Sequence, residues 1–156
     1  MKTKRNIFVV FMVLLCVVLT AVSALALTGC GKKEVELGSL DNPVKKGTGS
    51  KTFDFVVVNK AGEQKYFKIS TDADTVGAAL VADGVKLIAG DDSEYGLYVK
   101  TVDGETLDYT ADGYYWAFYI SEDLKLEAKD YAMTGVDSTP IEEGKIYVFL
   151  AEKASY

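Results

Sequence analysis

The sequence predicts an α+β fold, in which a mixed sheet carries one short helix packed on one face. Three observations indicate it: a β-hairpin pattern over residues 53–69, a helical period directly after it, and later strands that are apolar on both faces. Elements in this order pack as layers around one core. A hairpin that crosses to a helix over one face of the sheet makes the predicted fold β-grasp-like.

The hairpin pattern begins with FDFVVV at 53–58 and ends with YFKI at 66–69, with a glycine-containing turn between them. Two runs rich in β-branched and aromatic residues around such a turn form a hairpin. Since alternate side chains of a strand point to the same face, one face of this hairpin is expected to be buried. Its expected members are Phe53, Phe55, Val57, Phe67 and Ile69.

The helical period covers 74–84, where Val76, Ala79 and Leu80 share one face. Asp74 is the expected N-cap, because its carboxylate accepts backbone N–H groups and suits the helix dipole. Gly84 lies where a left-handed residue ends a helix. A helix this short is marginal alone, so it is expected to pack on the sheet.

The later strands carry most of the aromatic residues. A second hairpin joins 97–102 to 105–109 through Asp103-Gly104, the residues of a type I′ turn. The runs at 114–120 and 145–151 are apolar on both faces, which is typical of central strands. Residues 121–130 are expected to form a charged loop, and 131–136 a strand that returns toward the sheet.

The N-terminus carries a positive stretch, an apolar run at 7–27 broken only by Thr20 and Ser23, and then Gly29-Cys30. This pattern is typical of a bacterial lipoprotein signal peptide over residues 1–29, with Cys30 as the lipid-bearing residue. An uncleaved membrane anchor is the alternative, because such a run is long enough to span a bilayer. The polar sequence directly after Cys30 favours lipidation.

Residues 30–51 are polar and rich in Gly, Ser and Lys, which predicts a flexible tether between the lipid and a domain at 52–156. Without the leader, 14 basic residues stand against 23 acidic ones. This balance argues against nucleic-acid binding and against electrostatic docking on anionic lipid, so membrane attachment requires the covalent lipid. The expected location is the outer face of the bacterial cytoplasmic membrane.

The chain has no His, and its only Cys residues are Cys16 in the leader and Cys30. The predicted domain therefore lacks the commonest general base, the commonest metal ligand and a thiolate nucleophile. We expect no catalytic residues, no metal site, no covalent cofactor and no enzyme activity. Carboxylate pairs such as Glu142/Glu143 are better explained as solvated turn residues than as an acid–base pair.

The runs YWAFYI at 115–120, AMTGVD at 132–137 and GKIYVF at 144–149 resemble the transcobalamin-like C-terminal domain family, also called DUF4430. The resemblance covers residues 52–150, nearly all of the predicted domain. In transcobalamin and intrinsic factor, the similar domain closes over cobalamin opposite an α-helical domain. The resemblance thus implies that Trp116, Ala117 and Phe118 lie nearest a ligand. This chain lacks the α-helical domain, and its 121–130 loop is longer than in many bacterial relatives.

A flat ligand such as cobalamin or another corrinoid is the ligand that this resemblance implies. Tyr98, Tyr114 and Met133 are the further candidates, because aromatic and thioether side chains can cover the face of a flat ligand. Tyr98, Tyr114 and Tyr131 lie at the ends of expected strands, where they are candidates for an apolar shelf. Core packing explains Trp116 equally well, since Trp is often buried with its N–H toward a partner.

The leading hypothesis is a lipid-anchored, extracytoplasmic ligand-binding module in an uptake system, with a vitamin transporter or a second ligand-binding domain as partner. The alternative is a cell-surface adhesion or scaffolding module that binds a protein or cell-wall partner through an aromatic sheet face.

Overall fold

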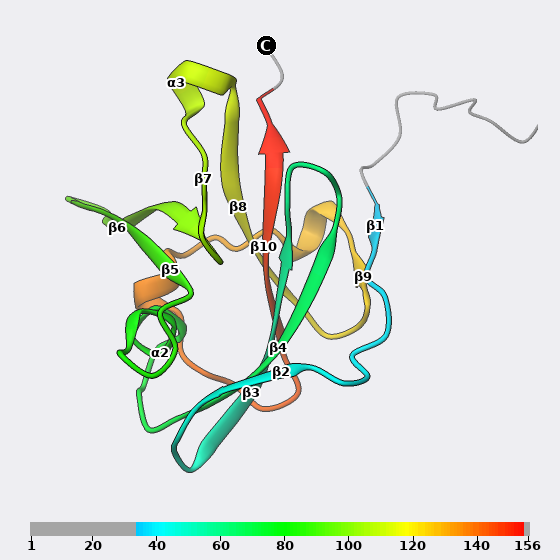
Figure 1. Ribbon diagram of the computed structural model, residues 1–156, viewed down its shortest axis with the longest axis vertical. Coiled ribbons are helices and arrows are strands. Elements are labelled where there is room, and N and C mark those ends of the chain that lie inside the picture. The colour runs from blue at the N-terminus through cyan, green and yellow to red at the C-terminus, as the bar shows by residue number, and fades with distance from the viewer. Residues whose placement is uncertain (1–33, 155–156) are drawn as a thin grey trace, which may run out of the picture. The chain divides into compact units, whose positions relative to one another are not determined.

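The computed structural model describes residues 34–154, and Figure 1 shows how their strands and helices are arranged. The predicted signal peptide and Cys30 lie outside the described residues, so cleavage and lipidation stay predictions. Within residues 34–154, no helix has the length and apolarity needed to cross a membrane.

Strands dominate the described chain, and its helices are short. The strands are β1 (Val35–Glu36), β2 (Val44–Gly47), β3 (Lys51–Val58), β4 (Gln64–Thr71), β5 (Ile88–Ser93), β6 (Gly96–Val102), β7 (Glu105–Thr106), β8 (Tyr114–Ser121), β9 (Lys125–Leu126) and β10 (Ile146–Lys153). The helices are α2 (Val76–Val81), α3 (Tyr109–Asp112) and the 3-10 turns η1 (Ala128–Asp130) and η2 (Val136–Ser138).

The central sheet has five strands in the order β2-β4-β3-β10-β8. Strand β3 pairs antiparallel with β4 and parallel with β10, so the sheet is mixed, as predicted for an α+β fold. The predicted hairpin and its shared face are confirmed, and the register places Phe53 opposite Ile69 and Phe55 opposite Phe67. These side chains bury one face of the sheet.

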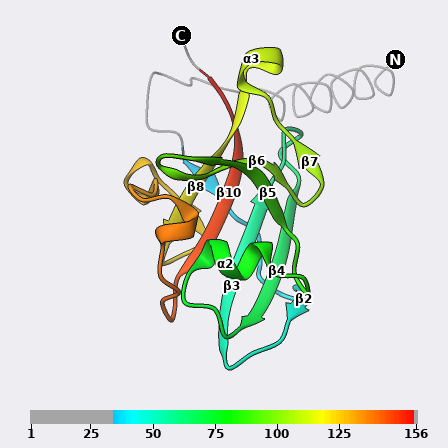
Figure 2. The same ribbon diagram turned by 90° about the vertical axis from the view of Figure 1, so that its left-hand side faces the viewer.

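Helix α2 and a second sheet, of order β5-β6-β7, cover that face (Figure 2). Val76, Ala79 and Leu80 are fully buried there, which confirms the predicted apolar face of the helix. The N-cap is Thr75 rather than Asp74: the Thr75 hydroxyl accepts the Ala78 N–H, while the Asp74 carboxylate binds the Lys51 ammonium at 2.8 Å.

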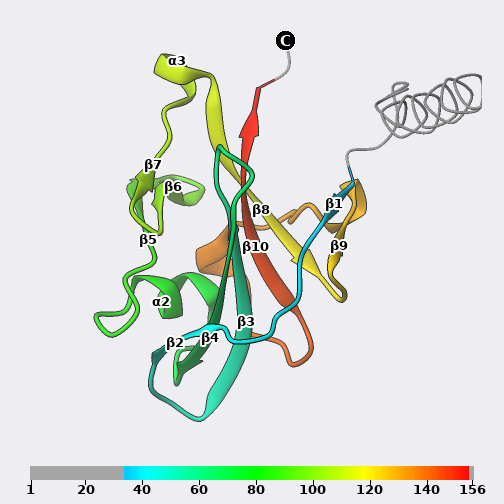
Figure 3. The same ribbon diagram turned by 45° about the vertical axis from the view of Figure 1, so that its right-hand side comes forward.

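The opposite face of the central sheet is covered by β1 and β9, which pair with each other (Figure 3). Leu37, directly after β1, and Leu126 of β9 are buried against Val56, Val148 and the neighbouring strand residues. The prediction that 30–51 is a flexible tether is therefore wrong for residues 34–50, because an apolar side chain in this segment completes a core.

Strand β2 also shows that this segment is not a flexible tether. It pairs in parallel with β4, and Ser50 donates from both its N–H and its hydroxyl to the Asp72 carboxylate at 2.8 Å. The polar composition that suggested a tether reflects an exposed edge strand. Within the described residues the domain thus begins near residue 34, not at 52.

Three further predictions about the strands can be compared with the structure. The hairpin predicted to join 97–102 to 105–109 is confirmed at its turn, where Asp103 and Gly104 have the positive φ that a type I′ turn requires. Its second strand is shorter than predicted, because β7 ends at Thr106 and Tyr109 begins α3. Strand β8 lies at an edge of the central sheet rather than in its middle. It is apolar on both sides because each face packs into one of the two cores. Residues 131–136 form a single bridge, Tyr119 to Tyr131, instead of a strand.

Candidate functional site: an aromatic pocket beside β8

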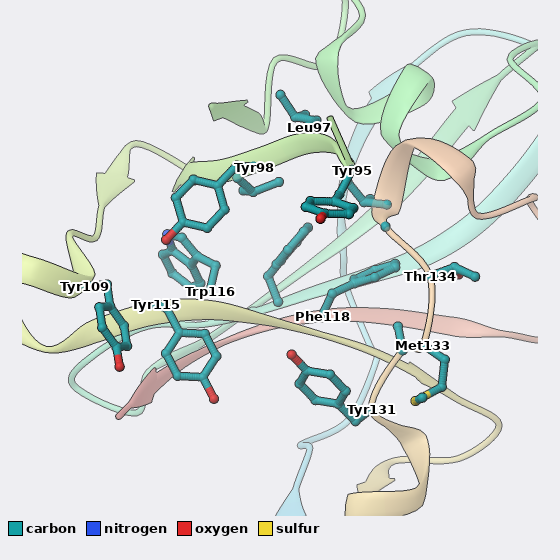
Figure 4. Close-up of a pocket in the computed structure, with 15 residues that line it drawn as sticks. Tyr95, Leu97, Tyr98, Tyr109, Tyr115, Trp116, Phe118, Tyr131, Met133 and Thr134 are labelled. Atoms are coloured by element: carbon teal, nitrogen blue, oxygen red, sulfur yellow. The ribbon is translucent and has the colours of Figure 1, made fainter. Parts of the chain in front are cut away.

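A cavity of about 500 Å³ lies between β6, β8 and the segment 131–136 (Figure 4). Its walls are predominantly aromatic. The aromatic lining residues are Tyr95, Tyr98, Tyr109, Tyr115, Trp116, Phe118, Tyr131 and Phe149. A concave, mostly apolar site of this size is typical of small-molecule binding sites.

The edge position of β8 explains how one strand supplies walls from both of its faces. Trp116 and Phe118 pack into the first core, and Tyr115 packs against the second. Because no strand pairs with the outer side of β8 along this stretch, side chains from the two faces meet around its edge. Figure 4 shows Tyr115 and Trp116 on either side of the β8 ribbon.

Exposed apolar side chains concentrate at this pocket. Eight large hydrophobic residues are exposed in the described chain, and five of them line the cavity: Tyr95, Tyr98, Tyr109, Tyr131 and Met133. Met133 is 93% exposed and Tyr95 is 85% exposed. A gathered apolar patch of this kind marks an interaction site, whereas scattered single residues do not.

Trp116 belongs to the core, which is one of its two interpretations from the sequence, while the other, ligand contact, stays a prediction. It is only 7% exposed and belongs to the first core, yet it also lines the pocket. Its indole N–H donates to the Lys100 carbonyl oxygen at 3.2 Å. This bond joins β8 to β6, so it holds two walls of the pocket together.

Tyr115 and Tyr119 are fixed by the buried carboxylate of Glu152 on β10. Their hydroxyls donate to its two oxygens at 2.9 Å and 2.7 Å. Burial, together with the hydrogen bond to Glu152, raises the pKa of Tyr115 to about 12 and raises the pKa of Tyr119 as well. Both side chains are therefore neutral phenols at physiological pH. Tyr115 presents its ring to the pocket, while its hydroxyl proton is committed to Glu152.

Two further tyrosines of the lining, Tyr131 and Tyr109, pack against Tyr119 and Tyr115. Tyr131 packs edge-on against Tyr119, with ring centroids 5.4 Å apart and an interplanar angle of 84°. Tyr109 lies 6.4 Å from Tyr115 by ring centroid. One buried carboxylate thus orients Tyr115 directly and supports Tyr131 through Tyr119.

Asp137 ties the opposite wall to β6. Its Oδ2 accepts the Leu97 N–H at 3.1 Å, and its buried Oδ1 has no hydrogen-bond partner within residues 34–154. Gly96 has a φ of +97°, and a Cβ at this position would lie 2.3 Å from Oδ2. The Asp137 carboxylate therefore joins η2 to β6, and glycine at position 96 makes this close approach possible.

The structure brings four of the six predicted ligand-binding residues to the pocket: Tyr98, Trp116, Phe118 and Met133. Ala117 is buried in the second core, and its short side chain does not reach around the β8 edge as that of Tyr115 does. Tyr114 lies outside the lining, at the start of β8, with the Lys60 ammonium 4.8 Å from its ring centroid.

Tyr131, named from the sequence as part of an apolar shelf at the strand ends, also lines the pocket. Three tyrosines of the lining, Tyr95, Tyr109 and Tyr115, were not among the predicted site residues. Their signal in the sequence is aromatic content alone, since they come from a turn, a helix and a strand. In the described part of the chain, no group of three or more His, Cys, Asp or Glu residues gathers as a metal site would require.

No family model matches this chain, and no curated protein matches it. Several solved structures do resemble it, among them the following two. A proposed metal-binding protein from Ruminococcus gnavus ATCC 29149 has a TM-score of 0.58 and 24% identity, over 68% of this chain and 100% of that one. Haptocorrin, in complex with Cbi, has a TM-score of 0.50 and 12% identity, over 65% of this chain and 25% of haptocorrin.

These likenesses show a shared fold. At such identities they do not assign an activity, and the match spans only a quarter of the haptocorrin chain.

Proposed function

We propose that this protein is a ligand-binding module whose aromatic pocket takes a flat, largely apolar ligand of the corrinoid class. The observation that carries the proposal is the gathering of five exposed apolar side chains around one cavity of about 500 Å³. The fold shared with haptocorrin, whose structure contains Cbi, supports the choice of ligand class. The resemblance of the β8 sequence to transcobalamin-like domains supports the same choice.

The geometry suits a broad ring system. Tyrosine rings cover apolar faces without needing a charged partner, and Met133 adds an adaptable, polarisable contact at the rim. The outer edge of β8 offers backbone N–H and C=O groups for the carboxamide side chains of a corrinoid. The indole of Trp116 is held by Lys100, so it does not need to be ordered when a ligand binds.

The pocket is open on one side, where Tyr95 and Met133 are almost fully exposed. A ligand bound here keeps part of its surface in water, so we expect an affinity near micromolar, about −8 kcal/mol. A second ligand-binding domain or a vitamin transporter that covers the open side would tighten binding. Such a partner would also bury the two exposed rim side chains.

The cellular setting of the proposal rests on the sequence. The signal peptide, the lipid on Cys30 and the outer face of the cytoplasmic membrane fit an uptake role. We also propose that the chain belongs to the DUF4430 family and has a β-grasp-like fold, because its sheet is mixed and carries α2 on one face.

Metal binding, proposed for the Ruminococcus gnavus neighbour, is not part of this proposal. Among the described residues the pocket is lined by tyrosines instead of a cluster of metal ligands.

Adhesion or scaffolding is the second candidate function. The exposed tyrosines and Met133 favour it as well, since aromatic residues and Met are enriched in protein interfaces. A protein partner would use the same open side of the pocket.

Titration with cobinamide and cobalamin tests the proposal. Trp116 is the only tryptophan of the chain, so its fluorescence reports on the pocket alone. We expect saturable quenching that weakens about tenfold in Tyr98→Ala and in Tyr131→Ala, a loss of about 1.4 kcal/mol each. Tyr114→Ala is the matched control, because it removes a tyrosine from the same region but outside the lining.

N-acetyl-tryptophanamide at the same corrinoid concentrations corrects for light absorbed by the ligand. Thermal unfolding of each variant verifies that the fold is intact. No saturable quenching up to millimolar cobinamide or cobalamin would reject the corrinoid proposal and leave adhesion as the better explanation of the patch.

A further inference from the structure

The open strand edges of the described sheets differ in how they are protected. The edge strand β2 carries Lys45 and Lys46, and the edge strand β5 carries Asp91 and Asp92. The other edges, in β1, β7 and β9, are two residues long. Charge and shortness are the usual means by which proteins prevent unwanted strand pairing. Strand β8 has neither protection: it is eight residues long, and its sequence YYWAFYIS carries no charge.

Backbone groups of β8 point outward in the middle of this edge. The Ala132 N–H donates to the Phe118 carbonyl oxygen at 2.9 Å, so the peptide groups of Phe118 face away from β10. Because these groups alternate along an antiparallel strand, those of Trp116 face outward too. Within residues 34–154, neither the N–H nor the C=O of the Trp116 backbone has a hydrogen-bond partner.

The chain itself occupies both ends of this edge. At one end the Tyr114 N–H donates to the Asp112 carboxylate at 3.0 Å. At the other end Tyr131 bridges to Tyr119, and residues 132–135 belong to no strand. The free stretch is therefore short. It lies directly next to the place where residues 131–132 already pair with β8.

Side-chain space lies on both sides of the free stretch. Trp116 and Tyr98 line one side of the β8 ribbon, and Tyr115 and Tyr109 line the other. An added strand projects its side chains alternately to the two faces of a sheet, so it needs space on each. A flat ligand stacked on one wall does not account for an edge lined on both.

We propose that the β8 edge at Trp116 binds an extended peptide segment of a partner protein, which adds a short strand to the central sheet. The segment carries apolar side chains in alternation and no acidic residues. Asp108 and Asp112 lie at the two ends of α3, beside the lining residue Tyr109, and the Lys60 ammonium pairs with Asp112 at 2.9 Å. Glu152 accepts the hydroxyls of Tyr115 and Tyr119. No residue of the lining is basic, so an acidic side chain of a bound segment would have no lysine or arginine partner in the lining.

The inference goes beyond the proposed function, because it names a second ligand class and rests on the backbone of β8. Peptide and corrinoid would exclude each other, since both need the space between β6 and β8. Each binding is measured separately, so either one is open to rejection while the other stands.

A tethered strand tests the inference without requiring the natural partner. The Ala154 N–H donates to the Gly113 carbonyl at 2.9 Å, so residue 154, the last that the structure describes, lies beside the start of β8. A segment is therefore appended after Tyr156 through a Gly/Ser linker long enough to reach the β8 edge. Short flexible linkers give effective concentrations near millimolar, so even a weak strand would dock. Three appended sequences are compared: KVYVTK, KYVYVK and KITITK.

Amide hydrogen exchange gives the readout. We expect at least one appended strand to slow exchange of the Trp116 amide about tenfold. The amides of Ala117 and Tyr119, which face β10, are internal controls and should keep their rates. The same strands with proline at alternate positions cannot form the ladder and should give no protection.

Two results would overturn the inference. Unchanged Trp116 exchange with all three strands would show that the edge does not accept an added strand. Equal protection by the proline versions would show that the pocket merely covers apolar side chains. Cobinamide titration of the untethered protein tests the corrinoid proposal independently.

Discussion

Tyr119 donates its hydroxyl proton to Oε1 of Glu152 at 2.7 Å, and this bond crosses from β8 to the neighbouring strand β10. The same carboxylate accepts the Tyr115 hydroxyl through its other oxygen. The pocket's tyrosine wall therefore depends on a residue that is itself buried and absent from the lining.

Glu152→Ala should destabilise the fold and loosen that wall. The substitution leaves two partly buried phenol groups without their acceptor, which typically costs about 1–3 kcal/mol for each buried group left unpaired. Urea unfolding measures the loss. Glu152→Gln keeps one acceptor oxygen, so it should recover part of the stability. A Glu152→Ala protein as stable as the wild type would show that water replaces the carboxylate.

Alkaline pH should destabilise the protein through Tyr115 and Tyr119. Their folded-state pKa values are raised, to about 12 for Tyr115, above the ordinary value of 10.0. Between pH 10 and 12 the unfolded chain loses protons that the folded chain retains, so unfolding becomes more favourable as the pH rises. The stabilisation is complete below pH 10. Urea midpoints measured from pH 8 to 11.5 should fall less steeply in Tyr115→Phe/Tyr119→Phe than in the wild type.

Gly96→Ala should be more destabilising than Gly104→Ala. Both glycines have positive φ, +97° and +86°, so both substitutions strain the backbone, by roughly 1 kcal/mol or more. Only at Gly96 would the new Cβ also meet the Asp137 carboxylate, whereas nothing lies within 4 Å at Gly104. The difference between the two free energies of unfolding isolates the Gly96–Asp137 approach. Equal losses would mean that η2 shifts to accommodate the methyl group.

The sequence predicted those parts of the fold that local patterns determine. The β3–β4 hairpin, the buried face of α2 and the type I′ turn at Asp103-Gly104 all follow from spacing within about twenty residues. The edge position of β8 does not follow from its local pattern. Apolar residues on both faces show that both faces are covered, but not whether a strand pairs along each edge. The cover on its second face comes from Leu37, in a segment whose composition resembles a tether.

The pocket was predictable to a similar extent. Trp116 and Phe118, which the resemblance predicts to lie near a ligand, both line the pocket, because alternation along β8 sends both side chains to one wall. Ala117 was expected there from the family resemblance, but side-chain length decides which residue reaches around an edge. Tyr115, on the same face, does so and Ala117 does not. Tyr95 and Tyr109 join the lining only through the three-dimensional arrangement of β6 and α3 beside β8.

Residues 34–43 should contribute to stability, contrary to the behaviour of a tether. Leu37 is 6% exposed and packs with Leu126 over the second face of the sheet, and its N–H donates to the Leu124 carbonyl at 2.7 Å. Removing a buried leucine side chain typically costs about 2–5 kcal/mol, because a cavity remains where the core cannot collapse. Leu37→Ala should therefore lower the thermal midpoint by several degrees.

Val44→Ala is the matched control for Leu37→Ala, since Val44 lies in the same N-terminal segment but is 44% exposed. Its thermal midpoint should stay within about one degree of the wild type, because surface substitutions usually change stability by less than 0.5 kcal/mol. Deletion up to residue 43 should reproduce the Leu37→Ala loss and add that of the β1–β9 pairing. If the protein lacking residues up to 43 melts like the wild type, then residues 34–43 behave as a flexible tether and β1 does not stabilise the second core.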